Sequence, residues 1–182
     1  MIISASRRTD LPAFYPDWLF NRFREGRVLV RNPMNPHAIS DVRLSPDVAD
    51  GIVLWTKNPL PMLSRLSELY RYPYYFQFTL TAYGTDVEPS KTGVLAPAFQ
   101  TLSRKIGRER VVWRYDPIFF SARYTADEHC RRFRRLRCLG LIRKSVPSAF
   151  WTSTATPPAT RVRSARFLQP RRKGLSLPAG LP

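Results

Sequence analysis

Residues 51–81 read GIVLWTKNPLPMLSRLSELYRYPYYFQFTLT, and this stretch decides the fold class. It opens with GIVLW at residues 51–55, a continuous apolar run typical of a strand buried on both faces of a parallel sheet. Residues 62–70 then place apolar side chains at helical spacing. Residues 74–81 alternate apolar and polar side chains, as a half-buried strand does. Strand, helix and strand in this order predict a parallel pair joined by a right-handed crossover.

The flanking sequence continues this alternation toward both ends. The further elements that we predict are a strand at 1–6, a helix from Pro16 to Gly26, a strand at 27–31, a short ribbon at 41–44, a helix at 95–106, a strand at 111–115 and a helix opened by the capping box Thr125–Glu128. The order predicts an α/β protein of the β/α barrel type. A complete barrel takes on the order of 200 residues or more, so we expect only the N-terminal part of one, over residues 1–135.

The composition changes sharply after residue 135. The net charge of +17 by itself favours a nucleic-acid or anionic-membrane partner. Residues 136–182 contain nine Lys or Arg and no Asp or Glu, whereas residues 1–135 contain 21 basic and 13 acidic side chains. We therefore predict an irregular basic tail over residues 136–182. Nucleic-acid binding by this tail and by the Arg-rich helix that precedes it is the alternative function.

The apolar pattern also bears on membranes and on location. No apolar run reaches the length of a membrane span, and the N-terminal sequence MIISASRRTD does not read as a signal peptide. We expect a cytoplasmic protein without a membrane partner, and the sequence assigns no protein partner.

Polar residues follow several predicted strands, at the end where a β/α barrel places its active site. The candidates for binding a substrate or a small anionic ligand are Arg7, Arg8, Thr9, Asp10, Lys57, Asn58, Gln77, Thr79, Arg114 and Asp116. Arginine can hold an anion through two parallel hydrogen bonds. Several candidates also have a structural interpretation: an Asp10–arginine ion pair, an Arg114–Asp116 salt bridge, or a Lys57 side chain extended to solvent. The pattern identifies no catalytic residue.

Six motifs resemble one bacterial family described as a domain of unknown function, DUF1848. They are SASRRTDLPAFY (4–15), VLVRNP (28–33), LSPDV (44–48), IVLWTKNP (52–59), YPYYFQFTLT (72–81) and ERVVWRYDPI (109–118). Members of this family are similar to radical S-adenosylmethionine (radical SAM) barrels and carry a cysteine cluster near their C-terminus. The resemblance implies a barrel of the radical-SAM/TIM type. It also implies an iron–sulfur cluster in full-length members, with S-adenosylmethionine as a second cofactor to test.

This resemblance ends at about residue 135, and the family's cysteine cluster is missing. Thiolate-bound clusters typically need three or four cysteines, but this chain has only Cys130 and Cys138. We therefore expect no cofactor in this chain and a truncated, inactive protein. One permitted set of codons for residues 142–158, read after dropping two bases, gives TEKCAISFLDFYRDTA, which is similar to the family's sequence at this point. Our hypothesis is a frameshift near residues 135–141.

Overall fold

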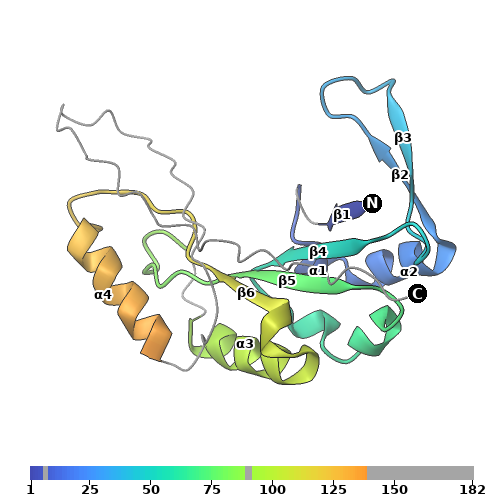
Figure 1. Ribbon diagram of the computed structural model, residues 1–182. Coiled ribbons are helices and arrows are strands. Elements are labelled where there is room, and N and C mark those ends of the chain that lie inside the picture. Colours follow the sequence, from blue (N-terminus) through green and yellow to red (C-terminus); the bar gives the residue numbers. More distant parts are fainter. Residues whose placement is uncertain (6–7, 89–91, 139–182) are drawn as a thin grey trace, which may run out of the picture.

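The computed structural model describes residues 1–5, 8–88 and 92–138 of the 182-residue chain. These residues form a four-stranded sheet, with helices packed on one face and a separate two-stranded ribbon beyond one end (Figure 1). No helix in these ranges is long and apolar enough to cross a membrane. The predicted tail at 136–182 lies almost entirely outside the described residues.

The main sheet has the strand order β1-β4-β5-β6, and all of its strand pairs are parallel. Its strands are β1 (Ile2–Ala5), β4 (Gly51–Thr56), β5 (Tyr74–Thr79) and β6 (Val111–Arg114). The apolar run at 51–55 became the buried strand β4, in which Ile52 and Leu54 are completely buried. Transfer of such side chains from water contributes roughly 1.5–3 kcal/mol each. The predicted parallel α/β class is therefore confirmed.

The alternation in β5 separates a covered face of the sheet from a more open one. The side chains on the covered face are Tyr74, Phe76 and Phe78, all of them buried. The ring of Phe78 packs edge-on against Phe99 of helix α3 (Thr92–Ile106), with 5.2 Å between ring centroids. The side chains on the opposite face are Tyr75, Gln77 and Thr79, and they are only partly buried. The face of the sheet away from the helices therefore carries polar side chains that are accessible to solvent.

Residues 27–31 do not enter the main sheet, so their prediction as a second barrel strand is wrong. They form β2 (Arg27–Arg31), which pairs antiparallel with β3 (Ile39–Arg43) as a two-stranded ribbon. Four of the five β2 residues are exposed, and both of its ends are arginines. Such a segment cannot be buried on both faces as a central parallel strand must be. The sheet formed by the described residues is open, and these residues form no closed barrel.

The helical predictions were correct at the capped helices and wrong between β4 and β5. Helix α2 (Pro16–Glu25) begins at Pro16 and is terminated by Gly26 as its C-cap. The φ of Gly26 is 69°, the left-handed conformation that glycine adopts readily. Residues 62–70 do not form one α-helix, because two short 3-10 helices, Leu60–Met62 and Leu66–Leu69, occupy this part of the chain. Pro59 and Pro61 lack the N–H groups that a continuous helix would need.

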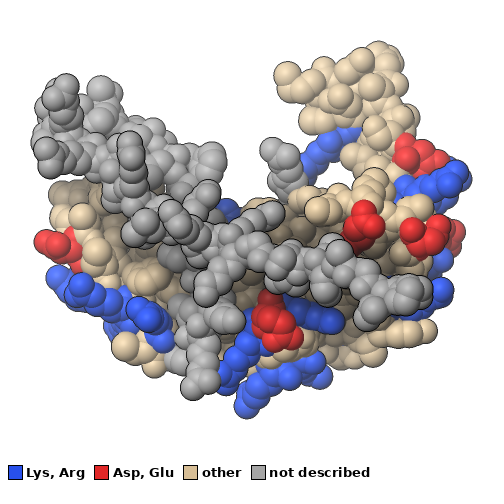
Figure 2. All heavy atoms as spheres, viewed as in Figure 1, with Lys and Arg blue, Asp and Glu red and all other residues tan. Residues whose placement is uncertain are grey.

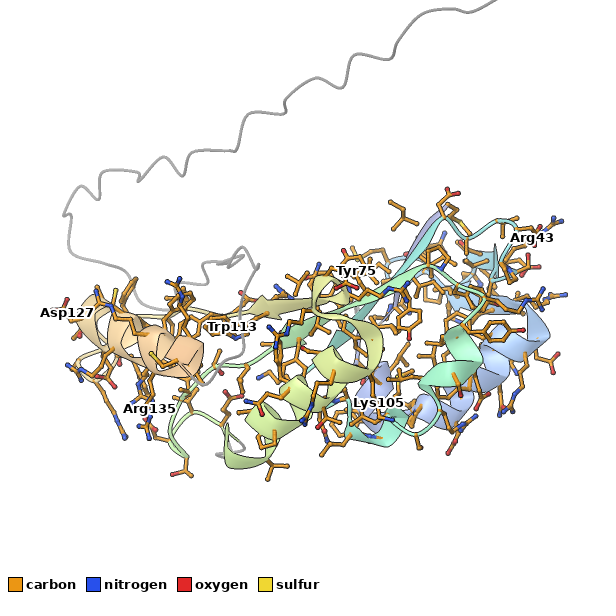
Figure 3. The ribbon with its side chains drawn as sticks, turned by 60° about the horizontal axis from the view of Figure 1, so that its bottom comes forward. Arg43, Tyr75, Lys105, Trp113, Asp127 and Arg135 are labelled. Atoms are coloured by element: carbon orange, nitrogen blue, oxygen red, sulfur yellow. The ribbon has the colours of Figure 1, made fainter. Side chains whose placement is uncertain are left out.

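Helix α4 (Ala126–Leu136) packs against β6 through aromatic rings. Thr125 caps the helix by accepting a hydrogen bond from the Glu128 amide, as predicted. Trp113 lies between β6 and α4 (Figure 3) and stacks on Phe133, with 4.7 Å between ring centroids. His129 is 6% exposed, and its two ring nitrogens hydrogen-bond to the Tyr115 hydroxyl and the Phe119 carbonyl. His129 is therefore a structural residue of the packing between β6 and α4.

Candidate functional site

A pocket of about 340 Å³ lies at the carboxyl ends of β4 and β5. Parallel strands end at the same edge of a sheet, which is where α/β proteins place their ligands. Four of the ten predicted site residues line this pocket: Asp10, Lys57, Asn58 and Thr79. The sequence therefore located the edge of the sheet at which the pocket forms. The lining residues that it did not single out include Trp55, Thr81, Tyr83 and Glu88.

Asp10 joins the end of the first strand to the end of β4. Its Oδ1 accepts a hydrogen bond of 3.0 Å from the Ala13 amide, which caps the short helix α1 (Leu11–Phe14). Its Oδ2 accepts a hydrogen bond of 2.7 Å from the Lys57 amide. In the described part of the chain this carboxylate is thus held by backbone amides rather than by the predicted arginine partner.

Lys57 is held over the pocket by Glu88. The Lys57 Nζ lies 2.6 Å from the Glu88 Oε2, and the other carboxylate oxygen of Glu88 accepts a hydrogen bond from the Thr81 hydroxyl. The Lys57 side chain remains 52% exposed although it is paired, so a ligand can reach it. Sequence reasoning missed Glu88 because it lies in a loop rather than at a strand end. Its position between β5 and α3 was the available signal, since such loops follow the ligand-binding edge.

Asn58 and Thr56 shape the turn that leaves β4. The Asn58 amide donates to the Thr56 hydroxyl at 2.9 Å, and the Asn58 side-chain oxygen accepts from the Leu60 amide at 3.2 Å. Such local bonds are typical of Asn at turns. Asn58 therefore positions the backbone beside Lys57.

Arg114 extends the site along the open face of the sheet. Its guanidinium lies 4.3 Å above the Trp55 ring centroid and 2.6 Å from the Asp116 carboxylate, so the predicted Arg114–Asp116 pair is present. Trp55 and Arg114 are on β4 and β6, which are separated by β5, so the arginine reaches across the middle strand. Both partners of the ion pair are about 15% exposed. A charge-assisted pair with an aromatic partner in such a place rigidifies this face.

The remaining predicted residues do not gather at the pocket. Gln77 lies on the open face and donates to the Tyr75 hydroxyl at 3.4 Å. Arg8 donates to the Arg31 carbonyl at 2.7 Å, and both Arg8 and Thr9 line a different pocket beside β1. Arg7 falls outside the described residues.

The charges at this edge of the sheet nearly cancel. Two cations, Lys57 and Arg114, face three carboxylates, those of Asp10, Glu88 and Asp116. A simple anion would have to compete with these carboxylates for the cations. The arrangement instead suits a ligand that carries both positive and negative groups, because each charge then meets an opposite one.

The described residues do not fit an iron–sulfur cluster. Cys130 lies on α4 and Cys138 just beyond it, both exposed, and neither is in a disulfide. In residues 1–5, 8–88 and 92–138 no group of three or more His, Cys, Asp or Glu side chains could hold a metal ion. A thiolate-bound cluster needs more cysteines than these.

Comparison with known proteins identifies a family and nothing closer. The chain matches none of the curated proteins and none of the solved structures. The family model described as "Domain of unknown function (DUF1848)" matches residues 2–153. This match runs past residue 135, where the motif resemblance ended. The six motifs, the parallel sheet that carries four of them and this match over most of the length lead to one conclusion: the chain belongs to the DUF1848 family.

Proposed function

We propose that this chain binds a small zwitterionic molecule in the pocket at the carboxyl ends of β4 and β5. The observation that supports the proposal is the half-open Lys57–Glu88 pair above a 340 Å³ pocket. That volume lies in the range of small-molecule sites, about 300–1,000 Å³. The Lys57 ammonium offers a partner for a ligand carboxylate. The Glu88 carboxylate offers a partner for a ligand ammonium or other cation.

Apolar groups complete the ligand preference. Phe14 and Trp55 line the pocket beside the charged pair. An aromatic or aliphatic body on the ligand would pack on these side chains, which adds affinity through burial of apolar surface. S-adenosylmethionine, which the family resemblance implies, is a molecule of this class and is the first ligand to test.

The test is a thermal-shift and calorimetric titration of the full chain with S-adenosylmethionine and, in parallel, with free amino acids and with inorganic phosphate. A ligand at 100 times its Kd stabilises the folded state by about 2.7 kcal/mol. We expect stabilisation by S-adenosylmethionine that Lys57→Met abolishes. Lys105→Met is the matched control, because Lys105 is exposed on α3 outside the pocket, and it should leave binding unchanged.

The other outcomes would overturn the proposal. Stabilisation by phosphate alone would define a simple anion site, and equal loss of binding in the two lysine variants would place the ligand elsewhere. Absence of binding by S-adenosylmethionine and by free amino acids would remove the zwitterion hypothesis.

A finer proposal concerns the relation to radical SAM barrels: the chain is the N-terminal part of such a barrel, inactive without its cluster. Its support is the parallel sheet in which β4, β5 and β6 are neighbours in chain order, with polar residues at their carboxyl ends. Sequencing the gene across codons 130–160 tests the proposed frameshift. A cysteine-bearing family sequence in another frame supports it. The family match to residue 153 overlaps this segment. If no other reading frame across these codons encodes a family-like sequence, the frameshift hypothesis is rejected.

Nucleic-acid binding remains the second candidate, supported by the exposed arginines of α4. The arginines concerned are Arg131, Arg134 and Arg135 of the helix and Arg137 at its C-cap, and Figure 2 shows basic side chains gathered over this helix. Arg131 is paired with Glu128, which reduces the charge offered to phosphates. Binding that weakens steeply with salt, and that Arg134→Gln with Arg135→Gln reduces, would support this function. Salt-independent binding, or none, would exclude it.

A further inference from the structure

A second pocket, here called the β1 groove, lies along β1 on the far side from β4. Its volume is about 500 Å³, and its walls are β1, helix α2 and strand β2. Within the described residues β1 pairs with β4 alone, so the groove runs beside an open strand edge. The lining is mainly apolar and includes Ile3, Leu19, Phe23, Val28, Leu29 and Val42. Concave apolar pockets of this size with a few polar groups are typical of ligand sites.

One side chain that lines this groove carries a buried polar atom without a hydrogen-bond partner. Arg22 lines the groove on the same face of α2 as Trp18 and Leu19. Its Nε is buried and has no hydrogen-bond partner among the described residues. A buried donor without an acceptor is costly to the fold. Pairing of this guanidinium with an anion would offset that cost, because an anion is the favoured acceptor for a charged donor.

The charges around the groove point the same way. Arg8, Arg22 and Arg31 line it, and its lining residues in the described part of the chain include no Asp or Glu. This composition differs from that of the zwitterion site, where carboxylates outnumber cations. The groove therefore combines an apolar body with a purely cationic rim.

We propose that the β1 groove binds a free monocarboxylate with an aliphatic body, of the fatty-acid class. The aliphatic chain packs between Leu29 of β2 and Leu19 of α2. The carboxylate pairs with the guanidinium of Arg22, because a planar guanidinium matches a carboxylate. Leu29 is 60% exposed and Trp18 is 45% exposed without a ligand, so binding would cover apolar surface that now contacts water. This site is independent of the zwitterion site.

The experiment is a titration of the full chain with decanoate below its micelle concentration, followed by tryptophan fluorescence and calorimetry. Decanol is the neutral analogue with the same aliphatic length, and acetate is the anion without it. We expect saturable binding of decanoate, with decanol weaker on the order of tenfold or more, since a hydrogen bond to a charged group is worth that much. Acetate should show no binding in the same concentration range.

Two variants and one control assign the binding to the groove. Arg22→Met keeps much of the side-chain volume and removes the charge, so it should weaken decanoate on the order of tenfold and leave decanol unchanged. Leu29→Asp places a carboxylate at an exposed position of the groove and should also weaken decanoate while the variant remains folded. Arg134→Met is the control, because this exposed arginine of α4 lies outside the groove.

Three results would overturn the inference. The first is no saturable binding of decanoate by the folded wild-type chain, judged by its circular dichroism. The second is equal affinity for decanoate and decanol, which would leave an apolar surface without a carboxylate site. The third is equal loss of decanoate affinity in Arg22→Met and Arg134→Met, which would show that only the overall charge matters.

Discussion

Replacing Asp10 by alanine should destabilise the whole sheet edge, because one carboxylate holds two backbone segments. The variant loses the cap on the Ala13 amide, which typically contributes about 1 kcal/mol. It also loses the 2.7 Å hydrogen bond from the Lys57 amide, and hydrogen bonds to charged groups contribute about 1.5–3 kcal/mol. The expected loss in the free energy of unfolding is therefore about 2–4 kcal/mol. For a chain of this length that corresponds to a fall in Tm of roughly 5–15 °C.

Urea denaturation followed by circular dichroism and tryptophan fluorescence measures this loss. Asp10→Asn separates the two contributions, because its amide oxygen can still cap Ala13 while its amide nitrogen cannot accept from Lys57. We expect Asp10→Asn to fall between wild type and Asp10→Ala. Asp41→Ala is the control, since its 3.2 Å pair with Arg27 is half exposed and such pairs contribute about 0–1 kcal/mol. If Asp10→Ala cost no more than Asp41→Ala, the assigned role of Asp10 would be wrong.

Three further changes test other parts of the structure. Tyr115→Phe removes the hydroxyl that is hydrogen-bonded to the buried His129 Nδ1, and it should lower the free energy of unfolding in urea by about 1–3 kcal/mol. An unchanged free energy of unfolding would show that this hydrogen bond does not stabilise the fold. A hydrogen bond from Arg132 holds the pKa of Glu128 below its ordinary value of 4.5, so the stability it adds is complete above that value and is lost as pH falls through the lowered pKa. The Tm of Glu128→Gln, measured between pH 7 and 3, should therefore fall less on acidification than the Tm of wild type. An equal fall in Tm for the two proteins would contradict this. Gly26→Ala should lower the free energy of unfolding by about 1 kcal/mol in the same urea assay, because a side chain is strained at the φ of 69° there. No atom lies within 4 Å of the added Cβ, so a steric clash adds nothing to this loss. An unchanged urea midpoint would show that the backbone relaxes.

Local patterns in the sequence were sufficient to predict the strands and helices whose burial depends on their own residues. The apolar run at 51–55 and the alternation at 74–79 both became strands of the main sheet. The Thr125 cap and the stop at Gly26 were also correct. These signals are reliable because capping and amphipathic burial involve residues close together in the chain. Of the ten candidate site residues that follow the predicted strands, only Asp10, Lys57, Asn58 and Thr79 line one pocket, and their role as a site stays a prediction.

The partners of each element required the tertiary structure. Residues 27–31 have a strand pattern, but only the fold decides that they pair with residues 39–43 rather than with the main sheet. The ion pair between Lys57 and Glu88 joins residues that are 31 positions apart. The stacking of Arg114 on Trp55 depends on two strands lying on either side of β5. The amino-acid sequence indicates which side chains are polar and where each strand ends. It does not record which distant side chains meet, because that depends on how the packed core sets the register and spacing of the strands.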